Sequence, residues 1–198
     1  LIDDIRGRGN AVTAGDIGYR YVVQTLQDRG ASDVLFDMNS RYDVPGYGYQ
    51  IAMGETALAE SWQSRDYLSH NHCMLGHLYS WLFSGIGGIS QESGSTAYKR
   101  IVIDPQIVGD LRDARVSFRS PYGLIRSEWK DAPDEFVQTI EIPANATARI
   151  CLPATDPAKV TESGKPVSGR KDMAVESGTD GRIELHVGSG VYRIAVEK

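Results

Sequence analysis

Residues 84–96 read Ser-Gly-Ile-Gly-Gly-Ile-Ser-Gln-Glu-Ser-Gly-Ser-Thr, and the hydrophobic pattern of the chain differs on the two sides of this stretch. Before it, apolar residues recur every three or four positions, which is the spacing of one helix face. After it, apolar and polar residues alternate, which is typical of a strand buried on one side. The stretch has neither period and is rich in glycine, so we place a domain boundary near Ser95.

The part before this boundary predicts three helices. Between residues 17 and 26 the apolar positions follow the i, i+3, i+4, i+7 spacing of an amphipathic helix, and Gly30 supplies a stop. A second helix, from Val34 to Met38, ends before Pro45. The third covers residues 73–83 and is apolar on most sides, so we expect it to be almost wholly buried.

The part after the boundary predicts a β-sandwich. Residues 114–118 and 125–129 alternate in polarity on either side of Pro121-Tyr122-Gly123, as in a hairpin. Further strands are expected at 136–142, 147–152, 182–187 and 191–196, and the polar stretch 155–181 is expected to form loops between edge strands. Short strands separated by Pro, Gly, Asn and Asp predict packed antiparallel sheets.

Composition excludes two classes of partner. The 198 residues carry a net charge of -5 with scattered basic residues, so nucleic acid is not expected. No apolar run approaches the roughly 20 residues that a membrane-spanning helix needs. Cys73 and Cys151 are expected to be buried free thiols. Because Leu1 is neither an initiator methionine nor part of a signal peptide, we expect further segments upstream.

The densest group of polar and aromatic residues lies between Asp43 and Trp62 and continues at His70-Asn71-His72. Aromatic rings stack on the apolar face of a sugar, and carboxylates, amides and imidazoles pair with its hydroxyls, so this mixture suits a sugar-binding cleft. Glu60 follows three apolar residues, but the residues alone favour a solvated glutamate at a helix end.

No metal or cofactor site is expected. His70 and His72 have no acidic or cysteine partner at a recognisable ligand spacing. The glycines after Ser84 follow a helix and not a strand, so they are interpreted as an interdomain turn and not as a phosphate-binding loop.

Several motifs resemble those of bacterial α-L-rhamnosidases of glycoside hydrolase family 78, in the same order and with similar spacing. They are Thr13-Ala-Gly-Asp-Ile-Gly-Tyr-Arg-Tyr21, Tyr47-Gly-Tyr-Gln-Ile51, Gly54-Glu-Thr-Ala-Leu-Ala-Glu-Ser-Trp62, Asn71-His72, Tyr98-Lys-Arg-Ile-Val-Ile-Asp-Pro105, Ala114-Arg-Val-Ser117 and Ser120-Pro-Tyr-Gly123. The resemblance covers most of the chain. It implies an α+β protein in two parts, with the last helices of an (α/α)6 catalytic barrel in residues 1–95 and an antiparallel β-sandwich in residues 96–198.

The resemblance also implies an activity, the removal of terminal α-L-rhamnose from glycosides with inversion. Glu60 matches the family's general base, which reverses the interpretation from the residues alone. His72 matches a histidine that contacts rhamnose, Trp62 and Tyr47 match aromatic pocket walls, and Asn71 is grouped with them as substrate-binding. The substrate would be a rhamnose-containing oligosaccharide or glycoside.

Two departures concern the pocket: Ala59 stands where many relatives have tryptophan, and the 12 positions from Glu60 to His72 (72 − 60 = 12) are fewer than usual. The general acid lies upstream in the family and outside this chain, so these residues alone should be inactive. The alternative function is a non-catalytic carbohydrate-binding or structural module.

Two further expectations concern the whole protein. The helices should expose apolar faces that pair with the rest of a longer polypeptide or, by self-association, with another copy. A periplasmic or extracellular location is slightly favoured over a cytoplasmic one, from the function alone.

Overall fold

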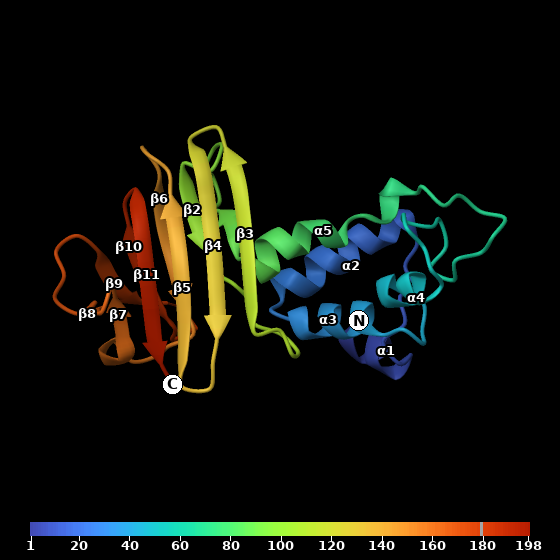
Figure 1. Ribbon diagram of the computed structural model, residues 1–198, viewed down its shortest axis with the longest axis horizontal. Coiled ribbons are helices and arrows are strands. Elements are labelled where there is room, and N and C mark those ends of the chain that lie inside the picture. The colour runs from blue at the N-terminus through green and yellow to red at the C-terminus, as the bar shows by residue number, and fades with distance from the viewer. Residues whose placement is uncertain (179) are drawn as a thin grey trace. The chain divides into compact units, whose positions relative to one another are not determined.

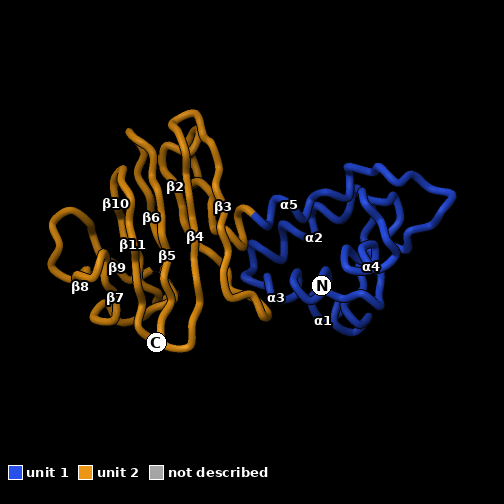
Figure 2. Tube along the Cα trace, viewed as in Figure 1, with its two compact units in different colours: residues 1–82 blue, residues 83–198 orange. Residues whose placement is uncertain are grey.

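A computed structural model describes residues 1–178 and 180–198, which form two compact units, Leu1–Leu82 and Phe83–Lys198 (Figures 1 and 2). Each unit has its own buried apolar core. The division falls earlier in the chain than the boundary expected near Ser95, and the domains 1–95 and 96–198 stay a prediction.

The first unit is helical and contains α1 (Ile2–Gly7), α2 (Asp16–Asp28), α3 (Ser32–Ser40), α4 (Tyr47–Ala52), the 3-10 turn η1 (Cys73–Leu75) and α5 (Leu78–Trp81). The first two predicted helices are confirmed as α2 and α3. Tyr19, Val23 and Leu26 are buried on one face of α2. Between the two helices Gly30 has φ +68°, a backbone conformation that glycine adopts without strain.

The third predicted helix is interrupted. Residues 73–86 form η1, the four-residue α5 and a π-helical turn, η2 (Leu82–Ile86). Leu75, Leu78 and Trp81 are buried, but Tyr79 is 64% exposed. The prediction of an almost wholly buried helix was therefore wrong, because apolar residues also occupy its solvent side. No described helix is both long and apolar enough to cross a lipid bilayer.

The second unit contains two β-sheets (Figure 1). The five-stranded sheet has the order β1 (Ile89–Gln91), β2 (Arg100–Ile103), β6 (Thr147–Leu152), β10 (Ile183–Val187), β9 (Ala174–Ser177). The six-stranded sheet has the order β3 (Asp113–Ser120), β4 (Gly123–Asp131), β5 (Glu135–Ile142), β11 (Gly190–Glu197), β7 (Val160–Glu162), β8 (Lys165–Pro166). The short turn η3 (Pro157–Lys159) precedes β7.

Alternating burial along the strands confirms the predicted pattern. In β5 every second residue is buried, including Phe136 and Ile140, and Ile150 and Leu185 of the other sheet are equally buried. The predicted hairpin is β3–β4, which closes at the pair Ser120 and Gly123. Inward-facing apolar side chains from both sheets thus supply the core of this unit.

One strand pair departs from the antiparallel pattern. β2 and β6 pair in parallel, whereas all other described pairs are antiparallel. Between them the chain builds β3, β4 and β5 of the other sheet, and such a long crossover allows parallel pairing. Stretch 155–181, expected to be loops, contributes β7, β8 and β9, of which β8 and β9 are edge strands.

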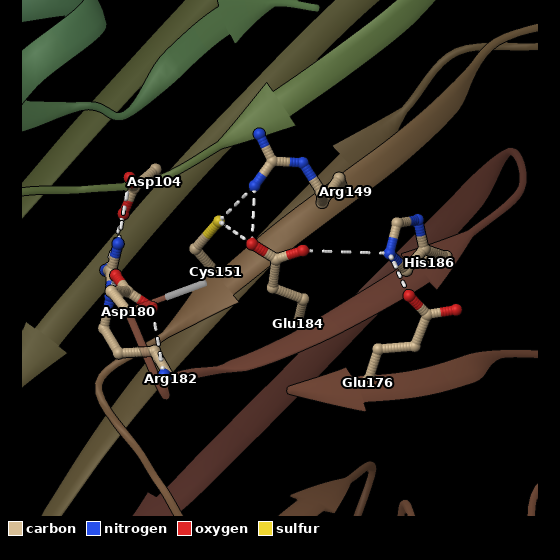
Figure 3. A network of polar contacts seen from close by, with 8 residues as sticks. All are labelled: Asp104, Arg149, Cys151, Glu176, Asp180, Arg182, Glu184 and His186. Atoms are coloured by element: carbon tan, nitrogen blue, oxygen red, sulfur yellow. Dashed lines mark hydrogen bonds and ion pairs between the residues drawn. The ribbon is translucent and has the colours of Figure 1, made fainter. Parts of the chain in front are cut away.

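A polar network lies across β6 and β10 on the five-stranded sheet (Figure 3). Arg149 Nη1 donates to Glu184 Oε1 at 2.7 Å and to Cys151 Sγ at 3.1 Å. Arg182 bonds both Asp104 and Asp180. Burial raises the pKa of the Cys151 thiol to about 12, so it stays protonated. Both cysteines are free as expected, but only Cys151 is buried and Cys73 is exposed.

Candidate active site

Helix α4 holds one side of the candidate site against the end of α3. A Cβ on Gly48 would lie 2.2 Å from the carbonyl oxygen of Arg41, so no larger residue fits there. The Tyr47 hydroxyl donates to the carbonyl of Leu75 in η1. These contacts fix α4 and define the direction in which its other side chains point.

Three aromatic rings form a cluster in the first unit. The Trp62 ring lies 4.8 Å from Tyr19 in an edge-on arrangement and 5.3 Å from Tyr47, measured between centroids. Trp62 is 5% exposed, and its Nε1 donates to the carbonyl oxygen of Ala14 at 2.7 Å. Burial raises the pKa of Tyr47 to about 12, and burial also raises the pKa of Tyr19 well above its usual range, so both hydroxyls remain protonated donors. The cluster is a rigid apolar wall with few free polar groups.

Glu60 lies on the surface, beside this cluster. Its backbone N–H donates to Ser69 O at 2.8 Å, and its Oε2 accepts from Ser69 N–H at 3.1 Å. Within residues 1–178 and 180–198 no group bonds to its other carboxylate oxygen, Oε1. One oxygen is therefore held and the other is available.

A pocket of about 400 Å³ opens beside Glu60. Its lining includes Thr13, Gly15, Pro45, Glu60, Trp62 and Gln63. A second pocket of about 280 Å³ lies next to α4 and is lined in part by Tyr47, Gln50 and Glu55. Glu60 and Trp62 thus share one pocket, whereas Tyr47 lines the other.

His72 lies at the end of the segment that pairs with Glu60. Its backbone N–H donates to Leu58 O at 2.7 Å. Its Nε2 is buried, lies 3.7 Å from Asp16 Oδ2 and has no hydrogen-bond partner among the described residues. Asp16 is itself oriented, because its Oδ1 accepts from Ile17 N–H at 2.9 Å. Asn71 is exposed, and its backbone N–H donates to Ser69 Oγ at 3.3 Å.

The two histidines of the His70-Asn71-His72 run have different partners. His70 Nδ1 lies 2.7 Å from Glu55 Oε2, and this hydrogen bond raises the pKa of His70. His72 faces Asp16 instead. Among the described residues there is no group of three or more His, Cys, Asp or Glu that could hold a metal ion.

Three positions beside the predicted residues were not singled out from the sequence. Gln50 bonds the backbone next to Glu60, Ser69 bonds the Glu60 carboxylate, and Asp16 faces His72. Gln50 is a polar residue between apolar neighbours in α4, and that pattern was the only signal in the sequence for a buried amide.

Comparison with known proteins matches both units to domains of one enzyme family. Residues 1–86 match the family model for the bacterial alpha-L-rhamnosidase 6 hairpin glycosidase domain. Residues 88–166 match the model for the bacterial alpha-L-rhamnosidase C-terminal domain.

Individual proteins of this family are similar to nearly the whole chain. An alpha-L-rhamnosidase of Streptomyces avermitilis is 29% identical over 206 residues, covering 99% of this chain and 19% of the relative. One from Formosa agariphila is 24% identical, with 99% and 21% covered. The chain therefore spans about a fifth of the length of the curated relatives it matches.

Solved structures give the same result. The crystal structure of the Streptomyces avermitilis enzyme complexed with L-rhamnose has a TM-score of 0.86 at 27% identity, covering 98% of this chain and 19% of that one. The alpha-L-rhamnosidase from Dictyoglumus thermophilum also has a TM-score of 0.86 at 27% identity, with 99% and 22% covered. The chain belongs to the bacterial α-L-rhamnosidases and corresponds to the end of their six-hairpin domain followed by their C-terminal domain.

Proposed function

We propose that this chain is the C-terminal part of an inverting glycoside hydrolase that removes terminal α-L-rhamnose from glycosides, with Glu60 as the general base. The observation that carries the proposal is the state of the Glu60 carboxylate. Oε2 accepts a hydrogen bond from Ser69 N–H, whereas no described residue bonds to Oε1, and the side chain borders a pocket of about 400 Å³. A general base needs one oriented oxygen that a water can reach.

In this mechanism Oε1 takes a proton from a water on one face of the sugar while that water attacks the anomeric carbon. A carboxylic acid on the opposite face protonates the leaving oxygen, and the product has the inverted configuration. The two carboxyl groups of inverting enzymes lie roughly 6.5–9.5 Å apart, which leaves room for the water. The general acid is assigned to a segment outside this chain.

The remaining site residues take binding roles. Trp62 supplies an apolar wall of the pocket that contains Glu60, and Tyr47 supports Trp62 from the neighbouring pocket. His72 directs its buried Nε2 toward Asp16, so its Nδ1 is the nitrogen assigned to a sugar hydroxyl. The exposed Asn71 adds a further polar contact at the rim of the site.

Exposed apolar side chains on the helical unit support the view that other segments cover it. Ile17, Tyr21, Ile51 and Tyr79 are each more than 60% exposed. We assign these faces to helices of the same polypeptide, with self-association of the isolated chain as the alternative. A monodisperse, protease-resistant monomer of residues 1–198 would contradict both.

The test is the stereochemistry of hydrolysis by the full-length parent protein. Proton NMR should detect β-L-rhamnose as the first product released from p-nitrophenyl α-L-rhamnoside. The α-anomer as first product would exclude inversion. No hydrolysis of any rhamnoside, together with rhamnose binding, would favour the non-catalytic carbohydrate-binding module.

A further inference from the structure

The amide of Gln50 lies under the segment that carries Glu60. Gln50 is 3% exposed and belongs to α4. Its Nε2 donates to the carbonyl oxygens of Ala59 at 3.3 Å and Ser61 at 3.2 Å, and its Oε1 accepts from Ala59 N–H at 3.3 Å. One side chain thus bonds the backbone on both sides of Glu60.

Hydrogen bonds in this segment alternate between two sides. Leu58 and Glu60 bond to residues of the 69–72 segment, through His72 N–H to Leu58 O and Glu60 N–H to Ser69 O. The intervening Ala59 and Ser61 bond to Gln50. Gln50 therefore bonds the backbone groups that the 69–72 segment leaves free. The exposed Glu60 side chain thus projects from a backbone that is hydrogen-bonded to Gln50 and to the 69–72 segment.

Gln50 can hold this segment because α4 is itself fixed. Gly48 packs directly against the Arg41 carbonyl, and the Tyr47 hydroxyl bonds to Leu75 O. A buried amide with both its donor and its acceptor satisfied is costly to rearrange, which favours a single position for its partners.

We infer that Gln50 is a positioning residue for the general base. Its amide is buried and bonded to Ala59 and Ser61, so we assign it the role of fixing the backbone from which Glu60 reaches the pocket. This inference rests on the proposed function, because it assumes that Glu60 is the base. A displacement of a catalytic group by about 1 Å can lower turnover by about 10²-fold. The Trp62 ring also has anchors of its own, because its Nε1 donates to Ala14 O and the ring packs against Tyr19 and Tyr47, so we expect sugar binding to change less than turnover.

The experiment uses the full-length parent and the substitution Gln50→Met, which keeps the length of the side chain and removes all three hydrogen bonds. Gln138→Met is the matched control, because Gln138 is also a buried glutamine but lies in β5 of the other unit. Glu60→Gln is measured in parallel. We expect Gln50→Met to lower kcat by at least about 10-fold while KM changes by less than about twofold. The control should keep both constants.

The outcomes separate this inference from the proposed function. Wild-type kcat in folded Gln50→Met, with Glu60→Gln inactive, would overturn the role of Gln50 alone. An active Glu60→Gln would remove the base and the inference together. If wild type hydrolyses no rhamnoside, hydrogen exchange of peptides covering residues 57–63 tests whether Gln50 holds this backbone. Faster exchange in Gln50→Met than in wild type would support that role, and equal exchange would overturn it.

Discussion

A buried polar pair in the β-sandwich should be removable with a gain in stability. Gln138 and Ser127 are both 0% exposed, and Gln138 Nε2 donates to Ser127 Oγ at 3.1 Å. Gln138 Oε1 is buried without a hydrogen-bond partner in the part of the chain that the structure describes. The perturbation is Ser127→Ala combined with Gln138→Met, which replaces the pair by apolar groups of similar shape.

The magnitude follows from the unequal cost of made and unmade hydrogen bonds. The Gln138–Ser127 bond contributes about 0.5–1.5 kcal/mol, whereas a buried group without a partner costs about 1–3 kcal/mol. The double variant loses the contribution of the hydrogen bond but no longer carries the cost of the buried Gln138 oxygen without a partner. We therefore expect the free energy of unfolding to rise by about 1 kcal/mol. Ser127→Ala alone leaves the whole Gln138 amide without a partner and should destabilise the fold by about 1–3 kcal/mol. Gln138→Met alone should be close to neutral, since Ser127 then becomes the group without a partner.

Native-state hydrogen exchange of peptides from β4 and β5 in the full-length parent measures these differences locally, since exchange of core strands reports their opening free energy. A gain of about 1 kcal/mol corresponds to roughly fivefold slower exchange. The two single variants and the double variant close a cycle that isolates the coupling of the pair. Faster exchange in the double variant than in wild type would show that Gln138 Oε1 is not an unsatisfied group.

Three further predictions concern Glu162, Cys151 and His72. Burial raises the pKa of Glu162, but hydrogen bonds from Ser163 and Arg170 leave the net pKa lowered. Its contribution to stability is therefore complete above the unfolded-state value near 4.5 and is lost as the pH falls through the lower folded-state pKa. Glu162→Gln should flatten the acid-induced loss of exchange protection in β7 and β11; an unchanged slope would contradict this. Because the Cys151 thiol stays protonated, peptide-resolved iodoacetamide labelling at pH 8 should modify it only after unfolding in urea, and rapid native labelling would argue against its burial. His72→Ala should raise KM for a rhamnoside by about 2- to 12-fold, the worth of one hydrogen bond, and an unchanged KM would remove its contact with the sugar.

Local patterns predicted most of the regular structure. The spacing of Tyr19, Val23 and Leu26 identified α2, because one face of a long amphipathic helix must be buried. The alternation of apolar and polar residues around Phe136 and Ile140 identified β5, because every second residue of a strand faces the core. In both elements the spacing of apolar residues repeats several times, and each repeat strengthens the prediction.

The remaining structure depends on contacts between distant residues. β7, β8 and β9 have two to four residues each and carry too little pattern to be recognised; they exist because neighbouring strands supply hydrogen-bond partners. Tyr79 is apolar but faces outward, which its residue type alone does not reveal. The parallel pair β2–β6 likewise follows from the chain's passage through the other sheet.

The candidate site was predicted by residue type and by resemblance, and its supporting contacts were not. Glu60, Trp62 and Tyr47 stand in motifs whose chemistry suits a sugar. The bonds from Gln50 and Ser69 to the Glu60 segment join residues that are 9 or 11 positions apart, and no local rule predicts such pairs. Asp16 was quoted within a motif, yet its approach to His72 depends on how α2 packs.

The most direct test of the account is the turnover of p-nitrophenyl α-L-rhamnoside by the full-length parent carrying Glu60→Gln. Asp66→Asn is the matched control, because Asp66 is an exposed carboxylate in the segment between Glu60 and His72. We expect kcat to fall by about 10²–10⁴-fold in Glu60→Gln, with the fold intact by circular dichroism, and to stay at the wild-type level in the control. Equal turnover in Glu60→Gln and wild type would contradict the assignment of Glu60 as the general base.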